Sequence, residues 1–166
     1  METERLLLRK ARPEDRASIY RNLWSRPESF RHTFWQPSPD EASSYDRILR
    51  TIAFQESHDS YFVVEKETGE VIGFAGVSQV GESLWEEGGI CLGPEYTGRG
   101  FGKEILASLT EYCRDRGAKE FLYRAREENV PSRRLALSSG FREIGKEEIS
   151  DGSGEPVTLI VFSKPL

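Results

Sequence analysis

The chain has 166 residues, of which 37% are hydrophobic and 31% are charged. This length can bury a core of its own, and this balance is typical of a soluble globular protein, not of a disordered or membrane-embedded chain. The 28 acidic residues outnumber the 23 basic residues and give a net charge of −5, whereas nucleic-acid binders usually carry a basic face. We therefore expect one domain over residues 1–166, with neither nucleic acid nor a membrane as its partner.

The first third of the chain predicts one strand and two helices. An apolar run at residues 5–9 predicts the strand, and a proline at the start of residues 13–24 suits the first turn of a helix. An aromatic loop follows over residues 25–37. Residues 38–41, Ser-Pro-Asp-Glu, have the pattern of a capping box and predict the start of the second helix. Its inner face would carry Ala42, Tyr45, Ile48, Leu49 and Ile52.

The remaining residues predict a series of strands and two more helices. A hairpin over residues 61–78 turns at Thr68-Gly69, and the next strand, residues 84–92, contains the pair Gly88-Gly89. Helices are predicted over residues 102–116 and 131–139, and strands over residues 121–125, 141–149 and 157–162. Hairpins combined with two strand–helix–strand crossovers predict a mixed sheet in an α/β domain.

Cysteine and histidine are scarce in this sequence. Cys91 and Cys113 do not make a disulfide framework, and His32 and His58 do not make a metal-ligand cluster. We expect no metal site and a reducing, cytoplasmic location. The acidic and polar first five residues predict that no signal peptide is present.

A glycine-rich turn at residues 97–103 joins a strand to a helix. Such a turn offers unpaired N–H groups at the positive end of a helix, which suits a phosphate. The dinucleotide pattern G-x-G-x-x-G fails because Lys103 occupies its third glycine position. The Walker pattern fails because Thr97 and Glu104 replace its first glycine and its Ser/Thr. A turn that merely starts a helix is the alternative.

This turn resembles the pyrophosphate loop of the GNAT N-acetyltransferase superfamily, Gln/Arg-x-x-Gly-x-Gly/Ala. Gly100 and Gly102 match that pattern, and Thr97 departs from it. Residues 129–141 look like the family's Asn-x-x-Ala/Ser helix, which ends in Gly-Phe. Three further segments, residues 3–9, 68–73 and 94–96, resemble the branch that includes ribosomal-protein N-terminal alanine acetyltransferases. The resemblance spans nearly the whole chain.

The resemblance implies a fold and a co-substrate. The fold would be a GNAT-like α/β fold, with a mixed, mostly antiparallel central sheet of about seven strands, a splayed centre and about four flanking helices. Acetyl-CoA would enter the splay and pair with a free strand edge. Its pantetheine arm would meet the backbone of Ile90, Cys91 and Leu92 and the side chains of Asn129 and Ser132. Its pyrophosphate would meet Thr97, Gly98, Arg99, Gly100, Phe101, Gly102 and Lys103.

The implied chemistry needs a base for the amine and a donor for the developing carbonyl oxyanion. The backbone N–H of Leu92 is the expected donor. Glu87 is the favoured base because it shares the face of Cys91 in a regular strand. A bulge at Gly88-Gly89 would exchange Glu87 with Glu86, so both glutamates stay candidates.

The leaving thiolate lacks the family's usual proton donor. Many members carry a tyrosine seven residues after the helix asparagine, and Ala136 stands there. Proton donation from Ser132 or water, or release without an acid, are the options. An acetyl-cysteine route through Cys91 is a further alternative, set against simple packing of a buried cysteine.

The acceptor is expected to be a primary amine, either a protein N-terminus or a small molecule. Walls would come from Trp24, Phe30, Phe34 and Trp35, polar specificity from Arg26, Arg31 and His32, and a rim from residues 150–156. At least half of these aromatic residues are expected to complete the core instead. A catalytically weak acyl-CoA-binding or regulatory module and an α/β scaffold domain are the alternative functions, and a homodimer is an open assembly.

Overall fold

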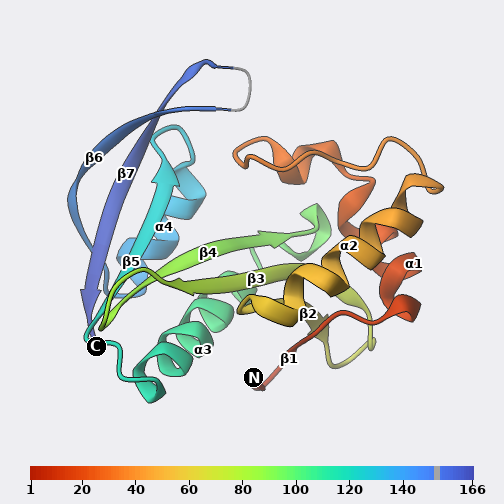
Figure 1. The fold of residues 1–166 in the computed structure, drawn as a ribbon, viewed down its shortest axis with the longest axis horizontal. Helices are drawn as coiled ribbons and strands as arrows, with labels where there is room; N and C mark the ends of the chain where they lie inside the picture. The colour runs from red at the N-terminus through yellow and green to blue at the C-terminus, as the bar shows by residue number, and fades with distance from the viewer. Residues whose placement is uncertain (152–153) are drawn as a thin grey trace.

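The computed structural model describes residues 1–151 and 154–166 of the chain (Figure 1). These residues form one seven-stranded sheet in the order β1-β2-β3-β4-β5-β7-β6. All neighbouring strands in the described ranges pair antiparallel except β4 and β5, which are parallel. This confirms the predicted mixed, mostly antiparallel sheet. The strands are β1 (Leu6–Arg9), β2 (Ser60–Glu65), β3 (Val71–Gln79), β4 (Leu84–Leu92), β5 (Glu120–Arg126), β6 (Arg142–Ser150) and β7 (Pro156–Pro165).

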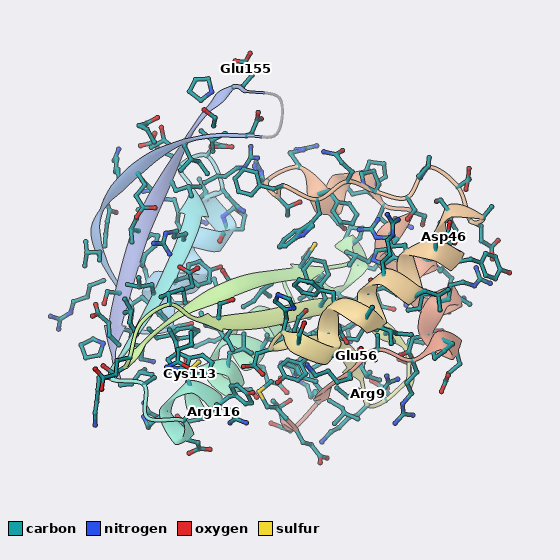
Figure 2. All side chains as sticks on the ribbon, in the orientation of Figure 1. Arg9, Asp46, Glu56, Cys113, Arg116 and Glu155 are labelled. Atoms are coloured by element: carbon teal, nitrogen blue, oxygen red, sulfur yellow. The ribbon has the colours of Figure 1, made fainter. Side chains whose placement is uncertain are left out.

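Helices cover both faces of the sheet. On one face, α3 (Phe101–Asp115) and α4 (Val130–Ser138) pack in a core cluster with β3, β4 and β5. On the other face, α1 (Arg16–Ile19) and α2 (Ser43–Ser57) pack in a second cluster. Asp46 and Glu56 mark the outer surface of α2 in Figure 2, whereas Cys113 points from α3 into the core. No helix in the described part of the chain has the length and apolar character needed to cross a bilayer.

The parallel strands β4 and β5 separate after a short pairing. Leu84–Glu86 pairs with Glu120–Leu122, and the two strands then diverge (Figure 1). The later residues of β5 pair only with β7 on its other side. The edge of β4 that faces β5 is therefore open, which is the predicted splayed centre.

The first predicted helix is in fact three short helical turns. A 3-10 turn, η1 (Pro13–Asp15), leads into α1, and a π-helical turn, η2 (Tyr20–Trp24), completes the segment. The amide of Ser25 donates to the carbonyl of Tyr20, five residues back, at 2.9 Å. The wider turn buries three consecutive side chains, Asn22, Leu23 and Trp24, which a single helical face does not do.

The predicted capping box before α2 is wrong. Ser38 is buried, and its amide donates to the carbonyl of Trp24 at 2.7 Å, so it belongs to the loop. The helix begins later, at Ser43, whose amide donates to the Asp40 carboxylate at 2.8 Å. A tertiary contact holds Ser38 in the loop, and a local hydrogen bond to Asp40 marks the start of the helix instead.

The predicted inner face of α2 is also wrong in part. Ile48 is buried as expected, but Tyr45 and Leu49 are 57% and 60% exposed. Polar side chains, Ser44 and Gln55, are buried in their place. The helix therefore turns a polar stripe toward the sheet.

Candidate active site

The glycine turn before α3 leaves helix N–H groups open. Gly98 and Gly100 have φ of +71° and +82°, the left-handed region that glycine enters at little cost. Gly100 is the N-cap residue of α3, and no side chain accepts a capping hydrogen bond from the first amides of this helix. In the described ranges, no hydrogen-bond acceptor is found for the amides of Phe101, Gly102 and Lys103. An uncapped helix start of this kind is a site for an anion.

Close packing and burial limit what this turn can offer a ligand. A Cβ on Gly102 would lie 3.3 Å from Leu135 Cδ2, so this glycine lets α3 approach α4. Phe101 has its ring in the core and offers only its backbone. Thr97 donates its hydroxyl to the carbonyl of Pro94 at 2.9 Å, within the local turn η4 (Pro94–Tyr96). The side chain of Thr97 is thus held locally.

The two cations of this turn, Arg99 and Lys103, have different surroundings. Arg99 Nη2 lies 2.8 Å from Oε1 of Glu65, a carboxylate that is only 4% exposed. The positive charge of Arg99 is therefore already balanced by Glu65. Lys103 is exposed and has no ion pair with any described residue. Arg5 lies over the Phe101 ring at 4.6 Å and donates to the carbonyl of Arg99 at 3.0 Å. The sequence did not reveal Arg5 because it lies 94 residues before its partner.

A bulge interrupts β4 at its glycine pair. Ala75 of β3 is opposite Ile90, and Val77 is opposite Glu87, so Gly88 and Gly89 together face the single residue between them. Gly89 has φ of +118°, which favours glycine. The bulge named as an alternative in the sequence therefore exists.

The bulge places the two candidate bases on opposite faces. Residues directly opposite in an antiparallel pair share a face. Glu87 is opposite Val77, which belongs to the core cluster around α3. Glu86 is opposite Ser78 and lies on the α2 face together with Cys91. The expectation that Glu87 shares the face of Cys91 is wrong for this reason.

The two glutamates have different electrostatic surroundings. Burial, together with the negative charge of Glu86, raises the pKa of Glu87 to about 8, although the Gly89 amide hydrogen-bonds the carboxylate and partly offsets the shift. Glu86 forms an ion pair with Arg124, which also contacts Glu147 of β6 at 3.0 Å. Glu87 is the group poised to exchange a proton near neutral pH, and Glu86 is engaged with a cation.

A phenol and a hydroxyl meet on the α3 side of the gap. Tyr123 Oη lies 2.8 Å from Ser132 Oγ. The Ser132 amide donates to Oδ1 of Asn129 at 3.2 Å, so Asn129 caps α4 as expected of an N-cap asparagine. Burial and the charge of Glu87 hold the pKa of Tyr123 well above its usual range. Ala136 is fully buried, so a tyrosine at that position would have no room.

The open edge of β4 presents alternate backbone groups to the gap. The Gly93 amide donates to the carbonyl of Ile72 at 2.9 Å, so this pair is hydrogen-bonded across β3 and β4. Antiparallel alternation then directs the backbone of Leu92 and Ile90 toward the gap, and that of Cys91 toward β3. The backbone of Cys91 therefore does not face the gap, and the expectation that it meets the pantetheine arm is wrong.

Cys91 has the surroundings of a packing residue. Its side chain is buried, and its thiol donates to the carbonyl of Ser29 at 3.4 Å. Burial raises the pKa of the thiol to about 12. A thiol that stays protonated at neutral pH is a poor nucleophile, which argues against an acetyl-cysteine route.

A cavity of about 520 Å³ lies between α2, the loop before it and the sheet. Trp35 and Phe74 form one wall, with ring centroids 4.8 Å apart in an edge-on contact. Gly88 of the bulge also lines the cavity, so the cavity reaches the splayed end of β4. The size is ordinary for a small-molecule site. Further lining residues are Trp24, Gln36, Ser38, Arg47, Arg50, Thr51, Phe54, Gln55, His58 and Ser78.

Only some of the residues expected to bind the acceptor lie at the cavity. Trp24 and Phe30 are buried in the core, whereas Phe34 and Trp35 are exposed. Arg26 pairs instead with Glu28 and Glu95, and neither Arg31 nor His32 lines the cavity. Of the predicted rim, residues 152 and 153 lie outside the described residues.

The cations of the cavity come from α2. Arg47 and Arg50 line it, and the sequence reading missed both because polar residues were assigned to the outer face of that helix. The spacing of Arg47, Thr51 and Gln55, four residues apart, was the available signal, since it places them on one face.

A family comparison gives the relationship of this chain to known proteins. Residues 5–142 match the model of the acetyltransferase (GNAT) domain. N-alpha-acetyltransferase RimI of Mycobacterium tuberculosis is 30% identical over 92 residues, which are 54% of this chain and 56% of RimI. The chain thus spans about half the length of this curated relative.

Solved structures share the fold. An acetyltransferase of the GNAT family from Bacillus anthracis has a TM-score of 0.83 at 19% identity, and the match covers 99% of this chain and 97% of that chain. The ribosomal-protein-S5-alanine acetyltransferase from Vibrio fischeri has a TM-score of 0.71 at 17% identity, and the match covers 99% and 95%. GNAT acetyltransferases use acetyl-CoA. Because the family model spans most of the residues that build the sheet, the splay and the glycine turn, the chain belongs to the acetyltransferase (GNAT) domain family.

Proposed function

We propose that the protein is an acetyl-CoA-dependent N-acetyltransferase that transfers the acetyl group to a primary amine by direct attack in a ternary complex. The observation that carries this proposal is the gap between β4 and β5, with Glu87 at its narrow end. An uncapped helix start lies on one side of the gap and a cavity on the other.

The residues at the gap fit acetyl-CoA. The free amides at the start of α3 and the unpaired Lys103 suit the pyrophosphate. The open edge at Ile90 and Leu92 suits the amide groups of the pantetheine arm. When bound, acetyl-CoA supplies an acetyl group activated as a thioester.

Glu87 is the proposed proton acceptor. The reaction joins the amine nitrogen to the acetyl carbon and breaks the C–S bond. One proton leaves the amine, and one reaches the sulfur. A carboxylate with a pKa of about 8 is matched to an amine that must lose its proton near neutral pH. Glu86 is the weaker candidate because its carboxylate is already engaged in an ion pair with Arg124.

Two groups complete the proposed chemistry. The backbone N–H of Leu92 would stabilise the negative charge on the carbonyl oxygen. The paired hydroxyls of Tyr123 and Ser132 would deliver a proton to the sulfur, in place of the tyrosine that Ala136 replaces. A protein that only binds acyl-CoA is the second candidate, and the absent tyrosine at Ala136 is the observation that favours it.

An amine panel distinguishes the two functions. The purified protein would be given acetyl-CoA with amino acids, polyamines and short peptides, and free CoA thiol and acetylated product would be measured together. The proposal expects amine-dependent thiol release and an equal amount of N-acetyl product. CoA binding by calorimetry without release for any amine would support the binding module instead.

A further inference from the structure

The cavity under α2 has a positive lining in an acidic protein. Its lining includes two arginines, Arg47 and Arg50, and one carboxylate, Asp59. The Asp59 carboxylate is not free, because the hydroxyls of Tyr61 and Tyr112 donate to it at 3.0 and 2.5 Å. The chain as a whole has a net charge of −5. The cavity is therefore suited to a ligand that carries negative charge.

Arg47 is a half-buried cation without an anion. Its Nη1 donates to the carbonyl of Gln36 at 2.8 Å and to Ser38 Oγ at 3.1 Å. Its guanidinium group lies 4.7 Å from the ring centroid of Trp24 and 5.5 Å from that of Phe30. Over residues 1–151 and 154–166, no carboxylate pairs with it. Neutral contacts thus fix the plane of a guanidinium that has kept its charge, and such a plane binds carboxylates through two parallel hydrogen bonds.

Gln55 is a second donor on the same face of α2. Its side chain is 1% exposed, and its Oε1 accepts from the Ala11 amide at 2.6 Å. That bond fixes the orientation of the side-chain amide, and its Nε2 is buried with no partner in the described structure. A buried donor without an acceptor is costly, and a ligand oxygen would satisfy it.

We propose that this cavity binds a small amine that also carries a carboxylate, such as an amino acid, with the carboxylate at Arg47. The inference rests on the proposed function, since it names the substrate class of the same site. Gln55 Nε2 would donate to a further oxygen of the ligand, and Trp35 and Phe74 would contact its apolar part. The amine would point to the end of the cavity that Gly88 lines, next to the gap.

The test compares two kinds of substrate, amino acids and their carboxamides, in two proteins. Wild type and Arg47→Gln would be given amino acids and the carboxamides of the same amino acids, and kcat/KM would be measured for each. The carboxamide changes the amine pKa, but this effect cancels when each ratio of acid to amide is compared between the proteins. Arg47→Gln should lower kcat/KM for the acids about 10-fold or more, as expected for a charge-assisted hydrogen bond, and change the amides far less. Arg142→Gln, an exposed arginine of β6, is the matched control and should change neither.

A binding measurement separates this inference from the proposed function. Trp24 and Trp35 line the cavity, so N-acetyl amino acids and their amides can be titrated by tryptophan fluorescence without turnover. The inference expects wild type to bind the acid more tightly than the amide, and Arg47→Gln to bind the two equally. This result would support the inference even if no thiol were released. Equal loss for acid and amide in Arg47→Gln would overturn it, as would a preference for peptide amides that does not depend on Arg47. If amine-dependent thiol release continues, either result contradicts this inference alone and not the proposed acetyl transfer.

Discussion

At the scale of single residues, the proposed chemistry of the gap depends on Glu87 and Tyr123. They come from β4 and β5, just beyond the last paired residues of each strand. The charge of Glu87 contributes to the raised pKa of Tyr123, so the two groups interact electrostatically. We therefore assign the proton that leaves the amine to Glu87 and the proton that reaches the sulfur to the pair of Tyr123 and Ser132.

Replacing Glu87 by glutamine should lower turnover and leave acetyl-CoA affinity nearly intact. Loss of a general base typically costs about 10²–10⁴-fold in rate. In the wild type, the rate should rise with pH through about 8 and then level off, because that is the pKa of Glu87. Steady-state rates and CoA titrations check this. A larger loss in Glu86→Gln than in Glu87→Gln would assign the base to Glu86.

The same group should make stability depend on pH. The pKa of Glu87 is raised from 4.5 to about 8, so the folded protein holds a proton that the unfolded chain releases across this range. Stability from this group is therefore complete at low pH and is lost as pH rises through the window, by up to about 1.4 kcal/mol per unit.

Glu87→Gln removes this contribution. Its free energy of unfolding, compared with that of the wild type, should increase between about pH 5 and about pH 8 in urea titrations. The exposed Glu56→Gln is the control and should show a constant difference. A constant difference for Glu87→Gln as well would show that its carboxyl titrates normally.

Removing the Tyr123 hydroxyl should slow turnover about tenfold or more with little change in CoA affinity. This loss of rate is small for general acid catalysis, because a thiolate whose conjugate acid has a pKa of about 8.5 is already a good leaving group. The raised pKa of Tyr123 places any alkaline fall above the usual range of assay, so the rate is the informative quantity. Tyr96→Phe is the control, and Ala136→Tyr should not restore activity because Ala136 is fully buried. An unchanged rate in Tyr123→Phe would leave water as the proton donor.

At the scale of secondary structure, local patterns predicted the elements after residue 60 to within one residue at each end, apart from the end of β7. Periodicity is sufficient for elements with a regular apolar face, such as α3 and β5, and the glycines and prolines at the turns set the ends of the others. The strand predicted over residues 5–9 is observed as β1, but the segment between residues 13 and 59 was predicted poorly. The π turn of η2 and the polar inner face of α2 arise from contacts with β3, with the loop and around the cavity, which no local window contains.

The start of α2 depends on a local hydrogen bond, which can be tested separately. Asp40→Ala removes the side chain that accepts from the Ser43 amide, and it should cost about 0.5–2 kcal/mol in the free energy of unfolding. Asp40→Asn keeps an acceptor at this position and should cost much less. Denaturant unfolding measures both. Equal losses in the two variants would mean that the capping bond contributes nothing.

At the scale of the whole molecule, the fold brings together groups that are distant in the chain. Arg5, which directly precedes β1, reaches the turn before α3, and Arg47 reaches the cavity from α2. The resemblance of short motifs predicted the sheet, its splay and the glycine turn, because these depend on backbone conformation. Among the side chains that line the cavity it predicted Trp24 and Trp35 but not Arg47 or Gln55, because those depend on how α2 packs on the sheet.

The central claim is that acetyl-CoA binds at the start of α3 and delivers its acetyl group to an amine. Gly100→Val and Gly117→Val test it most directly, since the two glycines lie at opposite ends of α3 with φ of +82° and +83°. Both variants carry similar backbone strain, but only Gly100 adjoins the free amides. After thermal unfolding has shown that both are folded, CoA affinity and amine-dependent thiol release should be lost in Gly100→Val and kept in Gly117→Val. Unchanged CoA affinity in folded Gly100→Val, or equal losses in both variants, would contradict the claim.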